Sequence, residues 1–143
     1  MRRIECLNKG WNFFGPTKEW TAVDVPHTWN AIDGQDGGND YWRGTCKYTK
    51  EFSMPEFDPA NQVVYLEFQG VNASADVTLN GHKAVHHDGG YSTFRVDVTN
   101  MLKDTNMLEV EVDNSVNDRV YPQKADFTFY GGIYRDVNLI VLN

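Results

Sequence analysis

Apolar and polar positions alternate most clearly in the middle of the chain. Every second residue from Ala75 to Leu79 is apolar and the residues between are polar, which is the period-two pattern of a strand with one buried face. Asn80-Gly81 follows, and this dipeptide suits the two positive-φ positions of a type I′ turn. The chain is therefore expected to return through residues 83–87 as a hairpin partner. A second turn at 88–90 and an alternating stretch at 94–98 add a third strand, so this region predicts an antiparallel sheet.

Similar patterns predict strands along the rest of the chain. Residues 3–14 indicate an irregular first strand in which Ile4 and Leu7 are candidate core anchors. Further strands are expected at 23–25, 46–52, 64–68, 108–112 and 136–142, with either a helical turn or a wide loop at 100–106. Some eight short strands, turn signals between them and almost no helical periodicity predict an all-β fold built as a two-sheet sandwich.

The last predicted strand differs from the others because it is apolar on both faces. Val137, Leu139 and Val141 share one face, and Ile140 and Leu142 share the other. A strand of this kind usually has something packed on both sides. Because the sequence stops just after it, we expect residues 1–143 to be a single domain of a larger, multidomain protein.

Composition narrows the class of partner. The chain of 143 residues has a formal net charge of −7 and no cluster of Lys and Arg, which argues against nucleic acid or an anionic membrane as partner. Aromatic residues make up 13% of the chain, and this surplus belongs either in a wide sandwich core or on a surface that stacks against sugars.

The compartment stays open at this level. The N-terminus lacks the apolar core of a signal peptide, and there is no apolar run long enough to cross a membrane. The protein is therefore expected to be soluble, and either cytoplasmic or exported with its signal peptide removed. Cys6 and Cys46 form either one disulfide or two free thiols.

A series of motifs runs through nearly the whole chain in order. They are Val25-Pro26-His27-Thr28-Trp29-Asn30, Tyr41-Trp42-Arg43-Gly44, Val77-Thr78-Leu79-Asn80-Gly81, Gly89-Gly90-Tyr91, Val112-Asp113-Asn114-Ser115 and Tyr130-Gly131-Gly132-Ile133-Tyr134-Arg135-Asp136-Val137. Together they resemble the N-terminal sugar-binding domain of glycoside hydrolase family two, which includes β-galactosidases, β-glucuronidases and β-mannosidases. The resemblance implies a jelly-roll β-sandwich of the galactose-binding-domain type. It also implies that an immunoglobulin-like domain and a (β/α)₈ barrel with the catalytic glutamates follow in the full enzyme.

Two residues are implied to bind substrate. In galactosidases of this family the first domain lends the sugar pocket an aspartate a few residues before the last motif, and Asp126 matches that position. A second contact comes from the segment that matches Tyr41 to Gly44, where some members have an asparagine and this chain has Arg43. A carboxylate accepts two hydrogen bonds from vicinal hydroxyls, whereas an arginine fork suits an acidic sugar. The alternative is that both residues are solvated loop charges.

Other candidate sites favour structural roles. His86-His87-Asp88 suggests a metal cluster, but neighbouring residues of a strand point to opposite faces, so both imidazoles cannot readily face one ion. Residues 113–118 lack the spacing of a calcium loop. Arg135-Asp136 is expected to be an ion pair at a strand start. No metal or cofactor is therefore expected, and most of Trp29, Tyr41, Trp42, Tyr91, Tyr130 and Tyr134 are expected to pack in or beneath the sandwich.

The sequence contains no recognisable acid and nucleophile pair, so no catalytic residue is assigned. We expect the 143 residues alone to lack hydrolase activity and the parent protein to hydrolyse a terminal β-glycoside, with β-galactosidase as the first choice and β-glucuronidase or β-mannosidase as the alternatives. Two other roles stay open. One is a stand-alone carbohydrate-binding module, and the other is an architectural domain that shields a barrel and builds a homo-oligomer interface.

Overall fold

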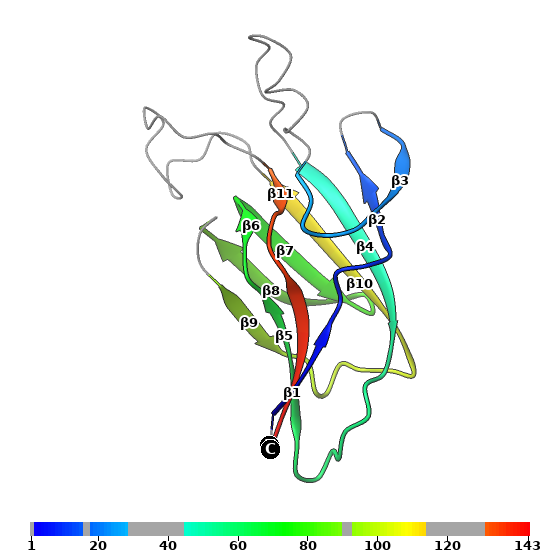
Figure 1. Ribbon diagram of the computed structural model, residues 1–143, viewed down its shortest axis with the longest axis vertical. Helices are drawn as coiled ribbons and strands as arrows, with labels where there is room; N and C mark the ends of the chain where they lie inside the picture. Colours follow the sequence, from blue (N-terminus) through cyan, green and yellow to red (C-terminus); the bar gives the residue numbers. More distant parts are fainter. Residues whose placement is uncertain (1, 16–17, 29–44, 90–92, 114–130) are drawn as a thin grey trace.

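The computed structural model describes residues 2–15, 18–28, 45–89, 93–113 and 131–143. These residues form twelve strands and contain no helix (Figure 1). The strands are β1 (Arg2–Cys6), β2 (Trp11–Phe14), β3 (Trp20–Val23), β4 (Thr45–Ser53), β5 (Val63–Phe68), β6 (Val71–Asn72), β7 (Ser74–Leu79), β8 (His82–Asp88), β9 (Phe94–Asp97), β10 (Thr105–Asp113), β11 (Gly132–Ile133) and β12 (Val137–Leu142). The described part also contains no helix that is long and apolar enough to span a membrane.

Two antiparallel sheets make up the body of the fold. The four-stranded sheet has the order β1-β12-β5-β9, and the six-stranded sheet has the order β3-β2-β4-β10-β7-β8. A short pair, β11 with β6, lies at one end of the sandwich (Figure 1). The first and last strands run side by side, with Arg2 opposite Leu142. This architecture confirms the all-β, jelly-roll β-sandwich predicted from the motifs.

The predicted hairpin is present, but the third strand lies elsewhere. Asn80 and Gly81 have φ values of 53° and 82°, as a type I′ turn requires, and they join β7 to β8. β9 does not extend this sheet; it pairs with β5 in the four-stranded sheet. The prediction that one sheet holds all three strands was therefore wrong. Alternation fixes which side chains of β9 face the core, but it does not identify the strand that accepts its hydrogen bonds.

The N-terminal region also departs from its prediction. The expected irregular strand at 3–14 is two strands, because the chain crosses from β1 in the four-stranded sheet to β2 in the six-stranded sheet. Leu7, between them, is buried as expected. Ile4 is 50% exposed, so it is not a core anchor. It points to the outer face of its sheet, opposite Ile140 of β12.

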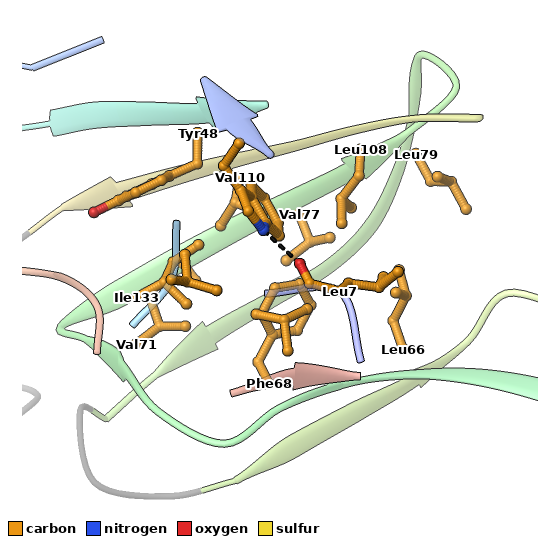
Figure 2. Close-up of a cluster of buried hydrophobic side chains, with 14 of the residues drawn as sticks. Leu7, Tyr48, Leu66, Phe68, Val71, Val77, Leu79, Leu108, Val110 and Ile133 are labelled. Atoms are coloured by element: carbon orange, nitrogen blue, oxygen red, sulfur yellow. Dashed lines mark hydrogen bonds between the residues drawn. The ribbon is translucent and has the colours of Figure 1, made fainter. Parts of the chain in front are cut away.

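A single apolar core fills the space between the two sheets. Tyr48 and Val110 from the six-stranded sheet meet Leu66 and Phe68 from the four-stranded sheet, and all four side chains are essentially inaccessible to water (Figure 2). The Trp11 indole is also buried, and its Nε1 donates a 2.6 Å hydrogen bond to the carbonyl of Leu7, drawn as the dashed line in Figure 2. A buried indole N–H needs such a partner, so this bond helps to fix the crossing between β1 and β2.

Residues 100–104 form a loop with no helix, which favours the second of the two predicted alternatives, and residues 105–106 already belong to β10. Asn106, fully buried, organises this loop. Its amide oxygen accepts from the backbone N–H of Lys103 at 2.7 Å, and its amide nitrogen donates to the carbonyl oxygens of Lys103 and Phe52. Asn80 in the hairpin turn donates to the same oxygen at 2.9 Å, which ties the loop to the turn.

The two cysteines are free, which excludes the disulfide alternative. Cys6 is exposed at the end of β1, whereas Cys46 is buried in β4 of the opposite sheet. Burial, together with the nearby Asp113 carboxylate, raises the pKa of the Cys46 thiol to about 12. A thiol with so high a pKa is a poor nucleophile at neutral pH.

Candidate functional site: the rim of the sandwich

Both residues predicted to bind sugar, Asp126 and Arg43, lie outside the described residues. The same is true of most of the candidate stacking aromatics, namely Trp29, Tyr41, Trp42, Tyr91 and Tyr130. Their predicted roles therefore stay predictions. The structure does describe the four residues that flank the segment with Arg43 (residues 29–44) and the segment with Asp126 (residues 114–130).

These four residues are Thr28 and Thr45, which flank residues 29–44, and Asp113 and Gly131, which flank residues 114–130; we call them the rim. Thr45 begins β4 and Asp113 ends β10, and the two are direct partners in the ladder of the six-stranded sheet. Gly132, next to Gly131, packs so closely on the backbone of residues 27–28 that an added Cβ would lie 3.1 Å from the Thr28 Cα. Gly132 also has a φ of +136°, which suits glycine alone.

Backbone hydrogen bonds connect the two halves of the rim. Gly132 pairs with Asn72 in the short β11–β6 ladder. The next residue, Ala73, donates its N–H to the carbonyl of Asp113 at 3.1 Å and accepts from the N–H of Gly89 at the same distance. The short ladder therefore connects Gly131 to Asp113, and all four ends of the two segments lie at one end of the sandwich. The β6 and β11 labels mark this end in Figure 1.

His27 and Tyr48 form the polar support beneath the rim. The Tyr48 hydroxyl lies 2.6 Å from Nδ1 of His27 and also takes part in a hydrogen bond with the backbone of Ile133. The N–H of His27 donates to the carbonyl of Ile133 at 2.8 Å, so the segment before the first rim residue is pinned to β11. Burial lowers the pKa of His27 and raises that of Tyr48. Both groups are therefore neutral near pH 7, so the pair positions the rim without adding a charge beneath it.

Sequence reasoning assigned no role to this pair. His27 lies within the Val25–Asn30 motif and Tyr48 faces the core, but the signal that joins them is spatial. The Phe13 ring completes the support, with centroids 4.6 Å from His27 and 4.8 Å from Tyr48. The pairing of β2 with β4 sets Phe13 opposite Tyr48, and the backbone hydrogen bond from His27 to Ile133 brings the imidazole against both rings.

The two imidazoles of the His86-His87-Asp88 run on β8 lie on opposite faces of the sheet, as expected. His86 faces outward, where its Nδ1 lies 2.7 Å from Asp76 Oδ1 and its Nε2 lies 3.1 Å from Asp88 Oδ1. His87 stacks on the Phe94 ring with centroids 4.3 Å apart. The two imidazoles therefore lie on opposite faces of the six-stranded sheet.

Arg135 and Asp136 have structural roles, but they do not pair with each other as predicted. Asp136 Oδ1 accepts a 2.9 Å hydrogen bond from Nδ2 of Asn8, and the guanidinium of Arg135 lies 5.6 Å from the centroid of the Tyr134 ring. Asn8 also accepts from the N–H of Val137. These contacts fix the start of β12 against the crossing between β1 and β2.

Comparison with known proteins agrees with this architecture. A β-glucuronidase from Bacteroides fragilis is 40% identical over 149 residues, and a β-galactosidase from Thermoanaerobacter pseudethanolicus is 31% identical over 144 residues. These alignments cover 98% and 97% of this chain but only 21% and 19% of the relatives. The chain therefore spans about a fifth of the length of these relatives.

The solved structures include a crystal structure described as an FMN-binding β-glucuronidase from Facaelibacterium prausnitzii L2-6. It superposes with a TM-score of 0.92 at 43% identity and covers 99% of this chain and 23% of that one. The family model described as glycosyl hydrolase 2 galactose-binding domain-like matches residues 36–133, which is more than half of the sequence. The chain therefore belongs to the glycosyl hydrolase 2 galactose-binding domain-like family, whose members form the N-terminal domain of these enzymes.

Proposed function

We propose that residues 1–143 form a non-catalytic, sugar-binding domain that completes the substrate pocket of a retaining β-glycosidase. In this proposal an immunoglobulin-like domain and a (β/α)₈ barrel follow in the same chain, and the barrel supplies the two catalytic carboxyl groups. Asp126 contributes a carboxylate to the sugar pocket, and Arg43 contributes a second polar contact. The share of about a fifth that this chain covers in its relatives supports the presence of further domains.

The convergence of the rim is the observation that carries the proposal. The segment with Arg43 and the segment with Asp126 both start and end at residues linked by one ladder pair and one short strand pair. Two segments anchored at one end of a sandwich can present their side chains to the same ligand. The neutral His27–Tyr48 pair supports this function, because it holds the rim in place without adding a charge beneath it.

The sugar is proposed to be a β-galactoside, because Asp126 matches the aspartate of the galactosidases. A β-glucuronide is the second candidate, and two observations favour it. Arg43 offers a fork that suits a carboxylate, and β-glucuronidases are among the relatives with 40% identity or more. Assays with p-nitrophenyl β-galactoside and p-nitrophenyl β-glucuronide on the native polypeptide that carries this sequence separate the two candidates.

Substitution of Asp126 tests the pocket role. In the native polypeptide, Asp126→Ala should lower kcat/KM for the preferred glycoside about 10- to 100-fold, since a hydrogen bond to a charged group is worth roughly 1.5–3 kcal/mol. Asp104→Ala is the matched control, because Asp104 is an exposed aspartate in the loop before β10. If Asp126→Ala left both turnover and KM unchanged, Asp126 would have no pocket role.

The mass of the native polypeptide tests the domain assignment. Intact-mass measurement and tryptic peptides from the source cells should give a chain several times longer than 143 residues. A native chain that ends near Asn143 would instead favour a stand-alone carbohydrate-binding module.

The role of Arg43 is tested by substitution in the native polypeptide. Arg43→Ala, with Arg2→Ala on the exposed β1 strand as control, shows whether the preference between the two glycosides depends on Arg43.

A further inference from the structure

We propose that the outer face of the six-stranded sheet binds a neutral sugar ring, which stacks on Trp20 and hydrogen-bonds to Thr45 and Glu111. The site lies on β2, β3, β4 and β10 and uses neither Asp126 nor Arg43. It goes beyond the proposed function, because it would operate in this chain whether or not a barrel follows.

The register of the sheet places the relevant side chains in one row. Trp20 is opposite Phe14, Phe14 is opposite Lys47, and Lys47 is opposite Glu111. Residues that are direct partners in a ladder project from the same face. The row therefore begins with two aromatic rings at the β3 edge and continues into a cation and a carboxylate, all on the face turned away from the core.

The two rings form an open platform beside a cavity. The centroids of Trp20 and Phe14 are 5.3 Å apart with an interplanar angle of 46°, so Phe14 supports the indole from one side. Trp20 is 53% exposed, although an indole that served the core would be buried, as Trp11 is. The adjoining cavity has a volume of about 300 Å³ and is lined by these rings together with Thr45, Cys46, Lys47 and Glu111. This volume is at the lower limit of pockets that hold small molecules.

The combination of groups selects for a sugar. An exposed indole offers a flat apolar surface to the C–H face of a pyranose ring. A hydroxyl at Thr45 and a carboxylate at Glu111 offer a donor and acceptors at the edge of that surface. A wholly apolar ligand would leave these polar groups without partners, and burial of a polar group without a partner is unfavourable.

The charges around the cavity select against an acidic sugar. Lys47 is already engaged, with its Nζ 2.8 Å from Glu109 and 3.7 Å from Glu111. Asp76, the next residue of the row on β7, adds another carboxylate beside Glu111. The net charge of this face is therefore negative, so a uronate carboxylate would be repelled whereas a neutral hexose would not.

NMR titration of the ¹⁵N-labelled 143-residue chain tests the site, because the chain has its own closed core. Methyl β-galactopyranoside should shift the indole resonance of Trp20 saturably, with a dissociation constant on the order of millimolar. Trp20→Ala should weaken binding about ten-fold or more, and Trp20→Phe should restore part of it. Met107→Ala is the control, since Met107 is also 47% exposed on this sheet but lies outside the cavity.

Charge selection is tested with methyl β-glucuronide in the same titration. It should bind several-fold more weakly than methyl β-galactopyranoside, and Glu111→Gln, which keeps an acceptor but removes a charge, should narrow that difference. The proposal is overturned if neither sugar gives a saturable shift, if Trp20→Ala binds as well as the parent chain, or if the acidic sugar binds as tightly as the neutral one. None of these results bears on Asp126, whose test is turnover by the native polypeptide.

Discussion

The outer faces of the two sheets differ in how deeply their central residues are buried. On the four-stranded sheet, Ile140 of β12 is only 1% exposed although it points away from the core, and Ile4 and Tyr65 are its ladder neighbours. On the six-stranded sheet, the corresponding central positions are Lys47, Asp76, Thr78, Glu109 and Glu111, and all of them are at least partly exposed. One outer face therefore contributes to stability by burial, whereas the other presents charges and hydroxyls to solvent.

Charged groups on the two outer faces also differ in burial. Glu67 lies on the outer face of the four-stranded sheet but is 5% exposed, and it is held by Arg95 at 2.7 Å, by Asn138 at 3.2 Å and by Gln69 at 3.3 Å. The Lys47–Glu109 pair on the other sheet is partly exposed and is a simple surface ion pair. The buried carboxylate of Glu67 has lost its hydrating water, whereas the carboxylate of Glu109 has kept more of it. Removal of a hydrogen-bond partner should therefore lower the free energy of unfolding more at Glu67 than at Glu109.

The largest expected effect is the loss of an apolar side chain from the buried outer face. Ile140→Ala should lower the free energy of unfolding by about 2–4 kcal/mol, since the side chain is buried and its removal leaves a cavity. Thr78→Ala at an outward position of β7 is the matched control and should cost less than about 1 kcal/mol. Urea denaturation of both variants measures the difference, and equal losses would abolish the distinction between the two faces.

The second-largest effect on stability is expected when the buried carboxylate of Glu67 loses its charge. Glu67→Gln should destabilise the fold by about 1–3 kcal/mol, because Arg95 and Asn138 lose a charged acceptor. Glu109→Gln, its counterpart on the six-stranded sheet, should cost about 0.5 kcal/mol or less. Chemical denaturation at pH 7 measures the free energy of unfolding of both variants. A larger loss in Glu109→Gln than in Glu67→Gln would contradict the greater contribution expected of the buried carboxylate.

Glu67 should also give the fold a dependence on acid. Burial acts to raise the pKa of Glu67, but hydrogen bonds from Asn138, Arg95 and Gln69 outweigh it, so that the pKa is lowered overall. The stabilisation is complete above the unfolded pKa of about 4.3 and is lost as pH falls through the lower folded pKa. Stability measured below pH 4.5 should therefore fall less steeply in Glu67→Gln than in the parent chain. Parallel curves would show that Glu67 does not couple folding to protons.

A smaller effect is expected from the surface ion pairs. The hydrogen bond to Glu109 is the main cause that raises the pKa of Lys47, and burial opposes it only partly. Lys47→Ala should cost about 0.2–1 kcal/mol at low ionic strength, and the difference should shrink in 1 M NaCl, where the screening length is about 3 Å. Melting curves at the two salt concentrations test this, and a loss that does not depend on salt would show that packing and not charge is responsible.

The smallest effect is expected from His86. Its hydrogen bond to Asp76 is the main cause that raises the pKa of His86; burial opposes it, and a second hydrogen bond to Asp88 adds to it. The imidazolium therefore stabilises the fold below the unfolded pKa of about 6.5, and this contribution is lost as pH rises through the folded pKa. His86→Gln should remove a slight gain in stability between pH 8 and pH 6. His82→Gln on the same strand is the control, and a loss as large as that of His86→Gln would contradict the role of the Asp76 contact.

Prediction from sequence worked best where one strand was considered at a time. The alternation in β7 and the Asn80-Gly81 turn were right because both depend on neighbouring residues. The two-sided apolar pattern of β12 was also right, since Val141 and Ile140 point to opposite faces and both are buried. The predictions that failed depended on tertiary packing. They are the single strand at 3–14, the strand at 23–25, the sheet that receives β9, the exposure of Ile4 and the Arg135–Asp136 pair.

Sequence by itself therefore determined most of the longer strands, the tight turn and, through the order of its motifs, the family of the domain. These features are encoded by local spacing, which sets the face that each side chain occupies. Only the tertiary structure decided that β9 joins the opposite sheet, that His27 and Tyr48 support the rim together, and that Trp20 stands in one row with Glu111. Each of these depends on contacts between segments that are separated in the chain. The backbone hydrogen bonds that set such contacts are made by groups that nearly all residues share, so side-chain pattern alone does not specify them.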